Sequence, residues 1–391
     1  MGFADIAGHD SPIRILKRAV YTGRLPHAYL FVGPPNVGKT TVAMELAKAL
    51  NCEMLQAPPD TAAVEPCGEC RACRAIEKEN YPDFMILRPT TKLEDHTSEK
   101  DDDPDDVREK QDLFIEMDDA MIRIDDIRDR LFPHVSLKRT SGRRKVYIIC
   151  RVETMNNEAA NAFLKTLEEP PPDTTFVLTA TNTSELLPTI VSRCQVINFN
   201  PVRSEETMEF LQTMYPGESP ERLQTLVSMA AGRIGWAQRL LQHPETLEIR
   251  GELLELCMRL ASADYVDCNW AGERLVDAAE RWWLATNDEE LAEKALKASR
   301  SRVLRVTMRD IIDILLTWLR DLLLVTCSSE TGSLINIDHL DDLKAVAVGT
   351  KIARYRRACS YLHDLKSDLR GNANLQLVSE ILALRLIWTH Q

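Results

Sequence analysis

The chain has 391 residues, of which 44% are hydrophobic, and its 48 basic residues against 60 acidic ones give a formal net charge of −12. This length exceeds what one compact core usually supports and predicts two or three domains. The acidic balance excludes a protein that holds DNA through its overall charge. The first residues lack the basic flank and apolar segment of a secretory signal, and the most apolar later stretch, Ile311 to Val325, contains charges, so we expect a cytoplasmic protein without a membrane span.

A phosphate-binding loop is the first motif along the chain. The segment Gly33-Pro34-Pro35-Asn36-Val37-Gly38-Lys39-Thr40, followed by Thr41, matches G-x-x-x-x-G-K-[ST]. An apolar run over 28–32 precedes it and a helical pattern over 40–50 follows, which is the context the motif requires. In such loops backbone N–H groups surround the phosphates, the lysine reaches the terminal phosphates and the threonine binds Mg²⁺. The loop predicts an ATP site, although sequence alone leaves its occupancy open.

A cluster of cysteines follows the helix after this loop. Cys67, Cys70 and Cys73 form a doubled C-x-x-C, and Cys52 lies fifteen residues upstream. Four thiolates at this spacing predict a closed, structural zinc site. An iron–sulfur cluster is an alternative, but the usual Cys-Pro three residues later is absent, and free thiols are another. We expect the remaining six cysteines to be buried small hydrophobes.

An acidic segment at 92–112 contains ten acidic and four basic residues. Such a composition cannot bury enough apolar surface to order itself, so it predicts a disordered insertion. An acidic interaction tail is the second interpretation.

The acidic pair that completes an ATPase site is missing where it is expected. The apolar run Lys145 to Ile149 predicts a buried strand, and in an ATPase the carboxylates at the end of such a strand hold Mg²⁺ and the attacking water. Here Cys150 and Arg151 follow it, and an arginine can neither accept a proton nor bind a cation. We expect Glu153, two residues on, to lie off the catalytic position. The sequence therefore predicts no intrinsic ATPase activity.

The first half of the chain alternates strands and helices. Apolar runs at 28–32, 84–87, 145–150, 174–180 and 194–199 predict an α/β domain with a parallel sheet over 1–201. Beyond Pro201 only helical patterns recur, which predicts a small helical domain over 202–242 and a larger all-α C-terminal domain over 243–391. Two basic clusters there, at 294–309 and 351–357, favour solvated helix faces, with a surface for a partner or for DNA as the alternative.

With these motifs placed, the chain resembles the bacterial clamp-loader family of AAA+ proteins. The resemblance covers most of residues 1–200. It rests on Leu25 to Phe31 leading into the phosphate loop, the Cys52, Cys67, Cys70 and Cys73 set, Asn161 to Pro171, and Ser192-Arg193-Cys194.

The family contains motor subunits of the gamma and tau type, which hydrolyse ATP, and delta-prime subunits, which do not. Motor subunits carry Asp-Glu where Cys150 and Arg151 stand, and a lid arginine where Gly235 stands, so the resemblance favours the delta-prime type. It implies that Arg193 acts in trans on the ATP of a neighbouring subunit. It implies that residues 202–242 form the lid domain and residues 243–391 the oligomerisation (collar) domain. It also implies a pentameric ring with motor and delta subunits that loads a sliding clamp onto primer–template DNA in replication.

Two other functions stay open at this stage. A motor subunit using Glu153 is the first, and a nucleotide-binding scaffold or recombination helper outside the clamp loader is the second.

Overall fold

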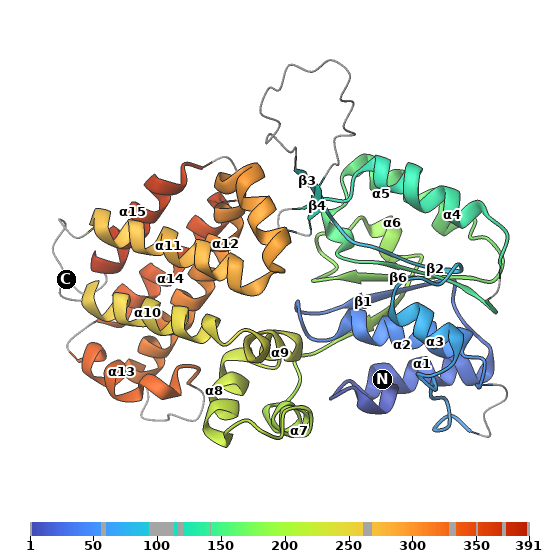
Figure 1. The fold of residues 1–391 in the computed structure, drawn as a ribbon, viewed down its shortest axis with the longest axis horizontal. Helices are drawn as coiled ribbons and strands as arrows, with labels where there is room; N and C mark the ends of the chain where they lie inside the picture. The colour runs from blue at the N-terminus through green and yellow to red at the C-terminus, as the bar shows by residue number, and fades with distance from the viewer. Residues whose placement is uncertain are drawn as a thin grey trace, which may run out of the picture. The chain divides into compact units, whose positions relative to one another are not determined.

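The computed structural model describes residues 2–55, 60–93, 113–115, 117, 120–140, 142–260, 268–327, 334–348, 351–369 and 373–388 (Figure 1). The chain forms two compact units. The first comprises 1–90, 120–216 and 231–236, and the second comprises 91–119, 217–230 and 237–391. In the described part of the chain, no helix has the length and apolar character that a membrane crossing requires.

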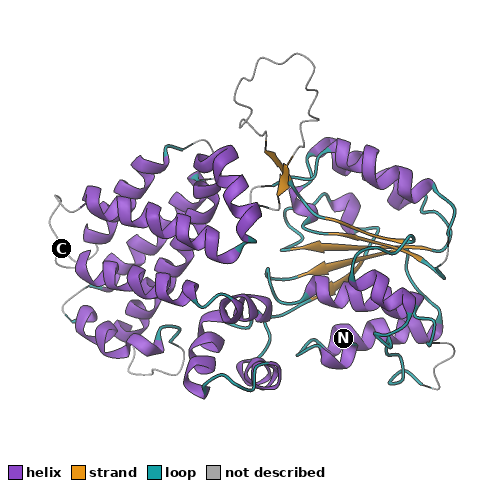
Figure 2. Cartoon of the chain, in the orientation of Figure 1, coloured by secondary structure: helices purple, strands orange, loops and turns teal. Residues whose placement is uncertain are grey.

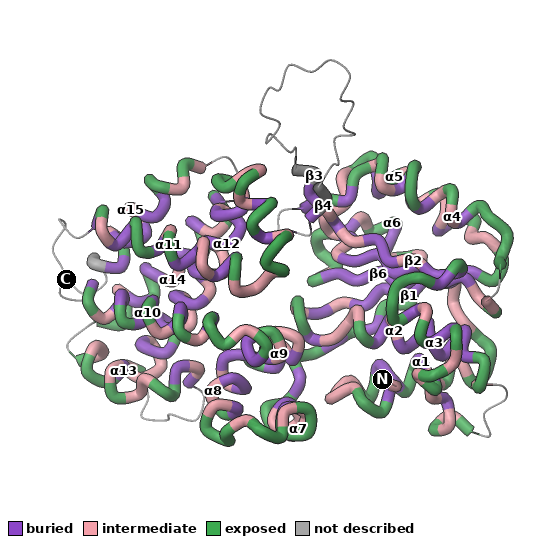
Figure 3. The backbone as a smooth tube through the Cα atoms, viewed as in Figure 1, coloured by how far each residue is buried: buried purple, intermediate pink, exposed green. Residues whose placement is uncertain are grey.

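A five-stranded parallel sheet forms the centre of the first unit (Figure 2). In spatial order its strands are β2 (Phe84–Leu87), β5 (Lys145–Ile149), β6 (Thr174–Ala180), β1 (Ala28–Val32) and β7 (Gln195–Asn198). Continuous apolar runs suit strands that are covered on both faces, and β1, β5 and β6 are buried along nearly their whole length (Figure 3). The predicted α/β fold is confirmed.

Alternate residues of each strand point into two separate core layers. Tyr29 and Phe31 pack with α1 (Asp10–Thr22), α2 (Lys39–Asn51) and α3 (Arg71–Glu77). Ala28 and Leu30 face the other layer, which is closed by the helical elements on the opposite side of the sheet. These are a π-helical turn at Asp126–Leu131, α4 (Phe132–Ser136), α5 (Asn157–Glu168) and α6 (Pro188–Val191).

This topology brings the site together. Strand β1 lies between β6 and β7, and β6 lies between β1 and β5, all parallel. The segments that follow β1, β5 and β6 therefore leave the sheet at the same edge, which is where α/β proteins bind ligands.

The predicted acidic insertion is bounded by a hairpin that the sequence did not indicate. Strand β3 (Thr91–Leu93) pairs antiparallel with β4 (Leu113–Ile115). Lys92 and Leu93, placed inside the insertion by the prediction, thus belong to a strand, and residues 94–112 lie outside the described residues.

Beyond Pro201 the described residues form helices and no strand, as predicted. They are α7 (Ser204–Met214), α8 (Pro220–Ala230), α9 (Ile234–Gln242), α10 (Glu245–Leu260), α11 (Cys268–Thr286), α12 (Glu289–Cys327, broken at Ser299), α13 (Leu340–Ala347), α14 (Ile352–Asp368) and α15 (Leu375–Trp388). The division into a lid and a collar remains a proposal. In the first basic cluster, Lys297 and Arg300 form exposed ion pairs with Glu293 and Glu280.

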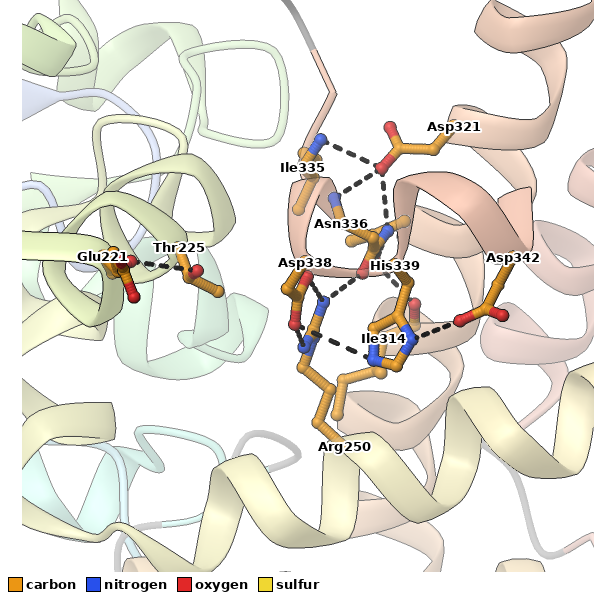
Figure 4. Close-up of polar contacts among 11 residues, drawn as sticks. Glu221, Thr225, Arg250, Ile314, Asp321, Ile335, Asn336, Asp338, His339 and Asp342 are labelled. Atoms are coloured by element: carbon orange, nitrogen blue, oxygen red, sulfur yellow. Dashed lines mark hydrogen bonds and ion pairs between the residues drawn. The ribbon is translucent and has the colours of Figure 1, made fainter. Parts of the chain in front are cut away.

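A buried polar network fixes the segment before α13 to two helices of the second unit (Figure 4). Arg250 of α10 donates to Asp338 Oδ2 at 2.6 Å and to Asn336 Oδ1 at 2.6 Å. Asp321 of α12 accepts hydrogen bonds from the backbone N–H of Asn336 at 2.6 Å and of Ile335 at 2.9 Å. Because a buried charge is costly unless it is paired, these bonds restrict the segment to one position.

We predict that Arg250→Ala lowers the free energy of unfolding by about 3 kcal/mol, because it leaves buried acceptors without their donor. Arg281→Ala is the matched control, since Arg281 pairs with Glu252 at the surface and its loss costs under about 1 kcal/mol. Five of the six tryptophans lie in the second unit, so urea unfolding monitored by tryptophan fluorescence reports mainly on this part of the chain. Equal effects of the two substitutions contradict the prediction.

Candidate functional site

The phosphate loop leaves β1 and ends where α2 begins at Lys39, as predicted. Its two glycines are required by geometry. A Cβ at Gly33 falls 2.2 Å from the carbonyl oxygen of Phe199, which no side chain tolerates. Gly38 has a φ of 105°, in the region that favours glycine. Thr40 is half-buried and Thr41 is exposed in the first turn of α2.

Four carbonyl groups of the loop have partners within the first unit. Lys39 Nζ donates to the carbonyl oxygens of Gly33 at 2.5 Å and Pro34 at 2.6 Å. The carbonyl of Val37 lies 2.6 Å from His9 Nε2, and that of Asn36 accepts from the backbone N–H of Gly235 at 2.9 Å. These contacts hold the carbonyl groups in place, and the loop ends at the N-terminus of α2, where backbone N–H groups bind phosphate in such proteins. The residues present therefore fit a nucleotide phosphate.

The surroundings of Lys39 disfavour the protonated form of its amine. Burial lowers its pKa to about 8, while the nearby Glu153 carboxylate and Cys150 thiol act in the opposite direction. Cys150 Sγ also lies 3.9 Å from Thr40 Oγ1, the hydroxyl that binds Mg²⁺ in such loops. A thiol therefore stands where a carboxylate is expected.

Glu153 acts on this site from the turn after β5. Arg151 adopts a left-handed conformation with a φ of 53°, and Val152–Thr154 form a 3-10 turn that redirects the chain. Glu153 Oε1 accepts from Thr181 Oγ1 at 2.8 Å and from the Thr181 backbone N–H at 3.2 Å. Its Oε2 is buried and has no hydrogen-bond partner among the described residues. The Glu153 carboxylate thus favours the charged form of Lys39. In an ATPase the carboxylates would instead stand at positions 150 and 151, directly after β5.

Two residues of this site were missed from the sequence. Thr181 directly follows β6, and a polar residue at the carboxyl end of a buried parallel strand is a signal that could have identified it. His9, at the start of α1, contacts the loop from a distant part of the sequence, and no local pattern indicates that contact.

The four predicted metal ligands come together in a second site. The sulfur atoms of Cys52, Cys67, Cys70 and Cys73 all lie within 4.8 Å of one another, so they could hold a metal ion. Backbone N–H groups of Cys67, Cys70 and Cys73 point at sulfur atoms of the set, at 3.3 to 3.5 Å.

Local structure explains this convergence. Cys52 directly follows α2, Cys70 caps the N-terminus of α3 and Cys73 lies in the first turn of α3. Lys48 of α2 forms ion pairs with Glu45 and with Glu77 of α3, which ties the two helices together.

The other cysteines follow the prediction only in part. Cys150, Cys257 and Cys268 are buried, whereas Cys194 and Cys359 are half-buried. Cys327 is exposed at the end of α12, so the prediction of burial is wrong there.

Arg193 follows the short helix α6 and has no hydrogen bond to the phosphate loop of its own chain among the described residues. Its guanidinium donates to Glu168 Oε1 at 2.7 Å and to the carbonyl oxygen of Thr189 at 2.9 Å. The side chain is 33% exposed.

The parallel sheet, the phosphate loop after β1 and the helices that follow define an AAA+ type P-loop protein. Residues 8–203 match the family described as DNA polymerase III, delta subunit, and the chain belongs to that family. The predicted resemblance to clamp-loader proteins is confirmed.

Relatives of both subunit types are similar to this chain. The tau subunit of Escherichia coli DNA polymerase III is 33% identical to this chain. The matched region covers 59% of this chain but only 31% of the length of the tau subunit. The delta-prime subunit of Pseudomonas aeruginosa is 36% identical over 55% of each chain, and that of Bacillus subtilis is 26% identical over 96% of this chain and 94% of its own. Since both types match, the choice between them depends on the site residues.

We predict that Glu153→Gln lowers the pKa of Lys39 below its value of about 8, because the carboxylate that favours the ammonium form is removed. The pH midpoint of Lys39 acetylation, followed by mass spectrometry, measures this shift. Glu158→Gln, an exposed carboxylate in α5, is the control and leaves the midpoint unchanged. An unchanged midpoint in the Glu153 variant contradicts the placement of its carboxylate.

Proposed function

We propose that this chain is a clamp-loader subunit of DNA polymerase III of the delta-prime type, which does not hydrolyse ATP itself. The observation that carries the proposal is the pairing of Thr40 with Cys150: the Mg²⁺-binding hydroxyl faces a thiol 3.9 Å away, and Arg151 comes next. ATP hydrolysis requires carboxylates to hold the metal and the attacking water. The phosphate loop keeps the features of a nucleotide-binding site, with Mg²⁺-ATP as its expected ligand, but lacks that part of the chemistry.

Arg193 gives the chain a role in hydrolysis at another subunit. A guanidinium supplied in trans stabilises the charge that develops on the transferred phosphoryl group. Its partial exposure, just after the short helix α6, supports this role. The partners proposed are motor and delta subunits in a pentameric ring, with the sliding clamp and primer–template DNA contacted through the assembly.

A second candidate function has one observation in its favour. The Glu153 carboxylate raises the pKa of Lys39, and one of its oxygens is buried without a hydrogen-bond partner among the described residues. That oxygen could bind a water molecule or a metal ion. On that basis the chain is a motor subunit of the gamma or tau type with a displaced acid. A scaffold or recombination helper has no observation that favours it.

ATP turnover separates the two candidates. We expect the isolated chain to hydrolyse ATP no faster than its Lys39→Ala variant, because the loop lacks the metal-holding acids. In a complex reconstituted with motor and delta subunits, we expect Arg193→Ala to reduce turnover by about 10³-fold at the site it serves. Arg139→Ala, which removes an exposed arginine paired with Asp173, is the control and leaves turnover unchanged.

Turnover by the isolated chain that Glu153→Gln abolishes contradicts the delta-prime proposal and supports the motor candidate. A chain that does not enter the complex at all contradicts both.

We further propose that the four cysteines hold structural Zn²⁺. Four thiolates at tetrahedral positions around Zn²⁺ are about 3.8 Å apart, which the sulfur separations accommodate. The set leaves no open position for a substrate, so the ion contributes to folding and takes no part in catalysis.

Purified protein should therefore contain one equivalent of zinc by elemental mass spectrometry. We expect Cys70→Ser to lose this zinc and to unfold at a lower temperature, because one of four ligands is replaced by a poorer one. Cys327→Ser, which changes an exposed cysteine outside the cluster, should retain both the zinc and the stability. Full zinc occupancy in the Cys70 variant contradicts the site.

A further inference from the structure

We propose that Glu168 is a positioning residue for Arg193: it holds the guanidinium in the orientation that the neighbouring subunit's nucleotide requires. The inference rests on the proposed trans role of Arg193 and adds a residue to it. Glu168 is the last residue of α5, and Arg193 follows α6, so the pair joins two elements that are 25 residues apart along the chain.

The guanidinium is held from two directions. Nη2 donates to Glu168 Oε1 at 2.7 Å, a charge-assisted bond of normal length. Nη1 donates to the carbonyl oxygen of Thr189 at 2.9 Å, and Ser192 Oγ lies at 3.5 Å from the same nitrogen. Two fixed acceptors on different elements define the plane of the group, which one flexible contact cannot do.

The same bonding leaves donors for a ligand. A guanidinium has five N–H groups, and among the described residues the Nε–H and the second N–H of Nη2 of Arg193 have no acceptor. These two donors can bind phosphate oxygens while Glu168 and Thr189 keep the others. Glu168 therefore orients Arg193 without using up the donors that the reaction needs.

Without Glu168, the Arg193 side chain would be freer to rotate. Arginine has several rotatable bonds, and an exposed guanidinium without an anchor samples many orientations. Catalytic groups lose much of their effect when displaced by about 1 Å, so orientation before the subunits meet has a measurable consequence. The pair is exposed to solvent, with the Glu168 side chain 51% accessible, so its contribution to the stability of the fold is small.

Glu169 offers a matched control. It is an exposed carboxylate one residue further on, at the end of the same helix, and no ion pair joins it to Arg193. Substitution of either residue changes the net charge of this surface by the same amount. Of these two glutamates, only Glu168 is hydrogen-bonded to the guanidinium.

The experiment measures ATP turnover by the complex reconstituted from this chain with motor and delta subunits. At the ATP site that Arg193 serves, we expect Glu168→Ala to lower kcat by about 10- to 100-fold with little change in KM, because Arg193 acts in the transition state. Glu168→Gln should recover part of the loss, since its amide oxygen accepts the same hydrogen bond. Glu169→Ala should leave kcat unchanged, and Glu168→Ala should add nothing to Arg193→Ala in the double variant.

Gel filtration of each complex confirms that the variants assemble equally. If Arg193→Ala impairs turnover while Glu168→Ala matches Glu169→Ala, the positioning role is wrong and the proposed function stands. A Glu168→Ala effect that adds fully to that of Arg193→Ala, or that raises kcat, also overturns the inference. If Arg193→Ala has no effect, the proposed function itself fails.

Discussion

The parallel pairing of β5, β6 and β1 is the constraint on which the site depends. Because the three strands run in one direction, the phosphate loop, the segment after Ile149 and Thr181 all leave the sheet at one edge. Apolar side chains alternate between two core layers, which hold the strands rigidly from both faces. The positions of Lys39 and Glu153 therefore follow from the packing of the sheet and not from loop structure alone.

The charged residues at this edge of the sheet explain why the chain combines a phosphate-binding loop with an incomplete ATPase site. Lys39 is buried and its pKa is lowered, and a single carboxylate acts on it from the turn after β5. An ATPase holds Mg²⁺ and the attacking water with carboxylates directly after the strand that corresponds to β5. Cys150 and Arg151 occupy these positions here, so the loop has the features for binding phosphates but lacks those carboxylates. Arg193, which is partly exposed and anchored on another helix, is suited to act on a neighbour. We therefore propose that this chain keeps the phosphate-binding loop, while hydrolysis takes place at a neighbouring subunit.

Much of this could be predicted from the sequence because the signals are local. The five strands each contain a short apolar run, the phosphate loop is a contiguous motif, and the cysteines have the spacing of metal ligands. The position of Glu153 could not be predicted, since it depends on the left-handed conformation of Arg151. Contacts such as His9 to Val37 and Arg250 to Asp338 join residues far apart in sequence, and no periodic pattern reports them. The β3–β4 hairpin was missed because each strand has only three residues.

A structure of the assembled complex with a non-hydrolysable ATP analogue tests the central claim most directly. The account predicts that the Arg193 guanidinium lies within about 3 Å of the terminal phosphate of nucleotide bound to the adjacent subunit. Arg193 facing solvent, with another side chain of this subunit contacting that phosphate, contradicts it.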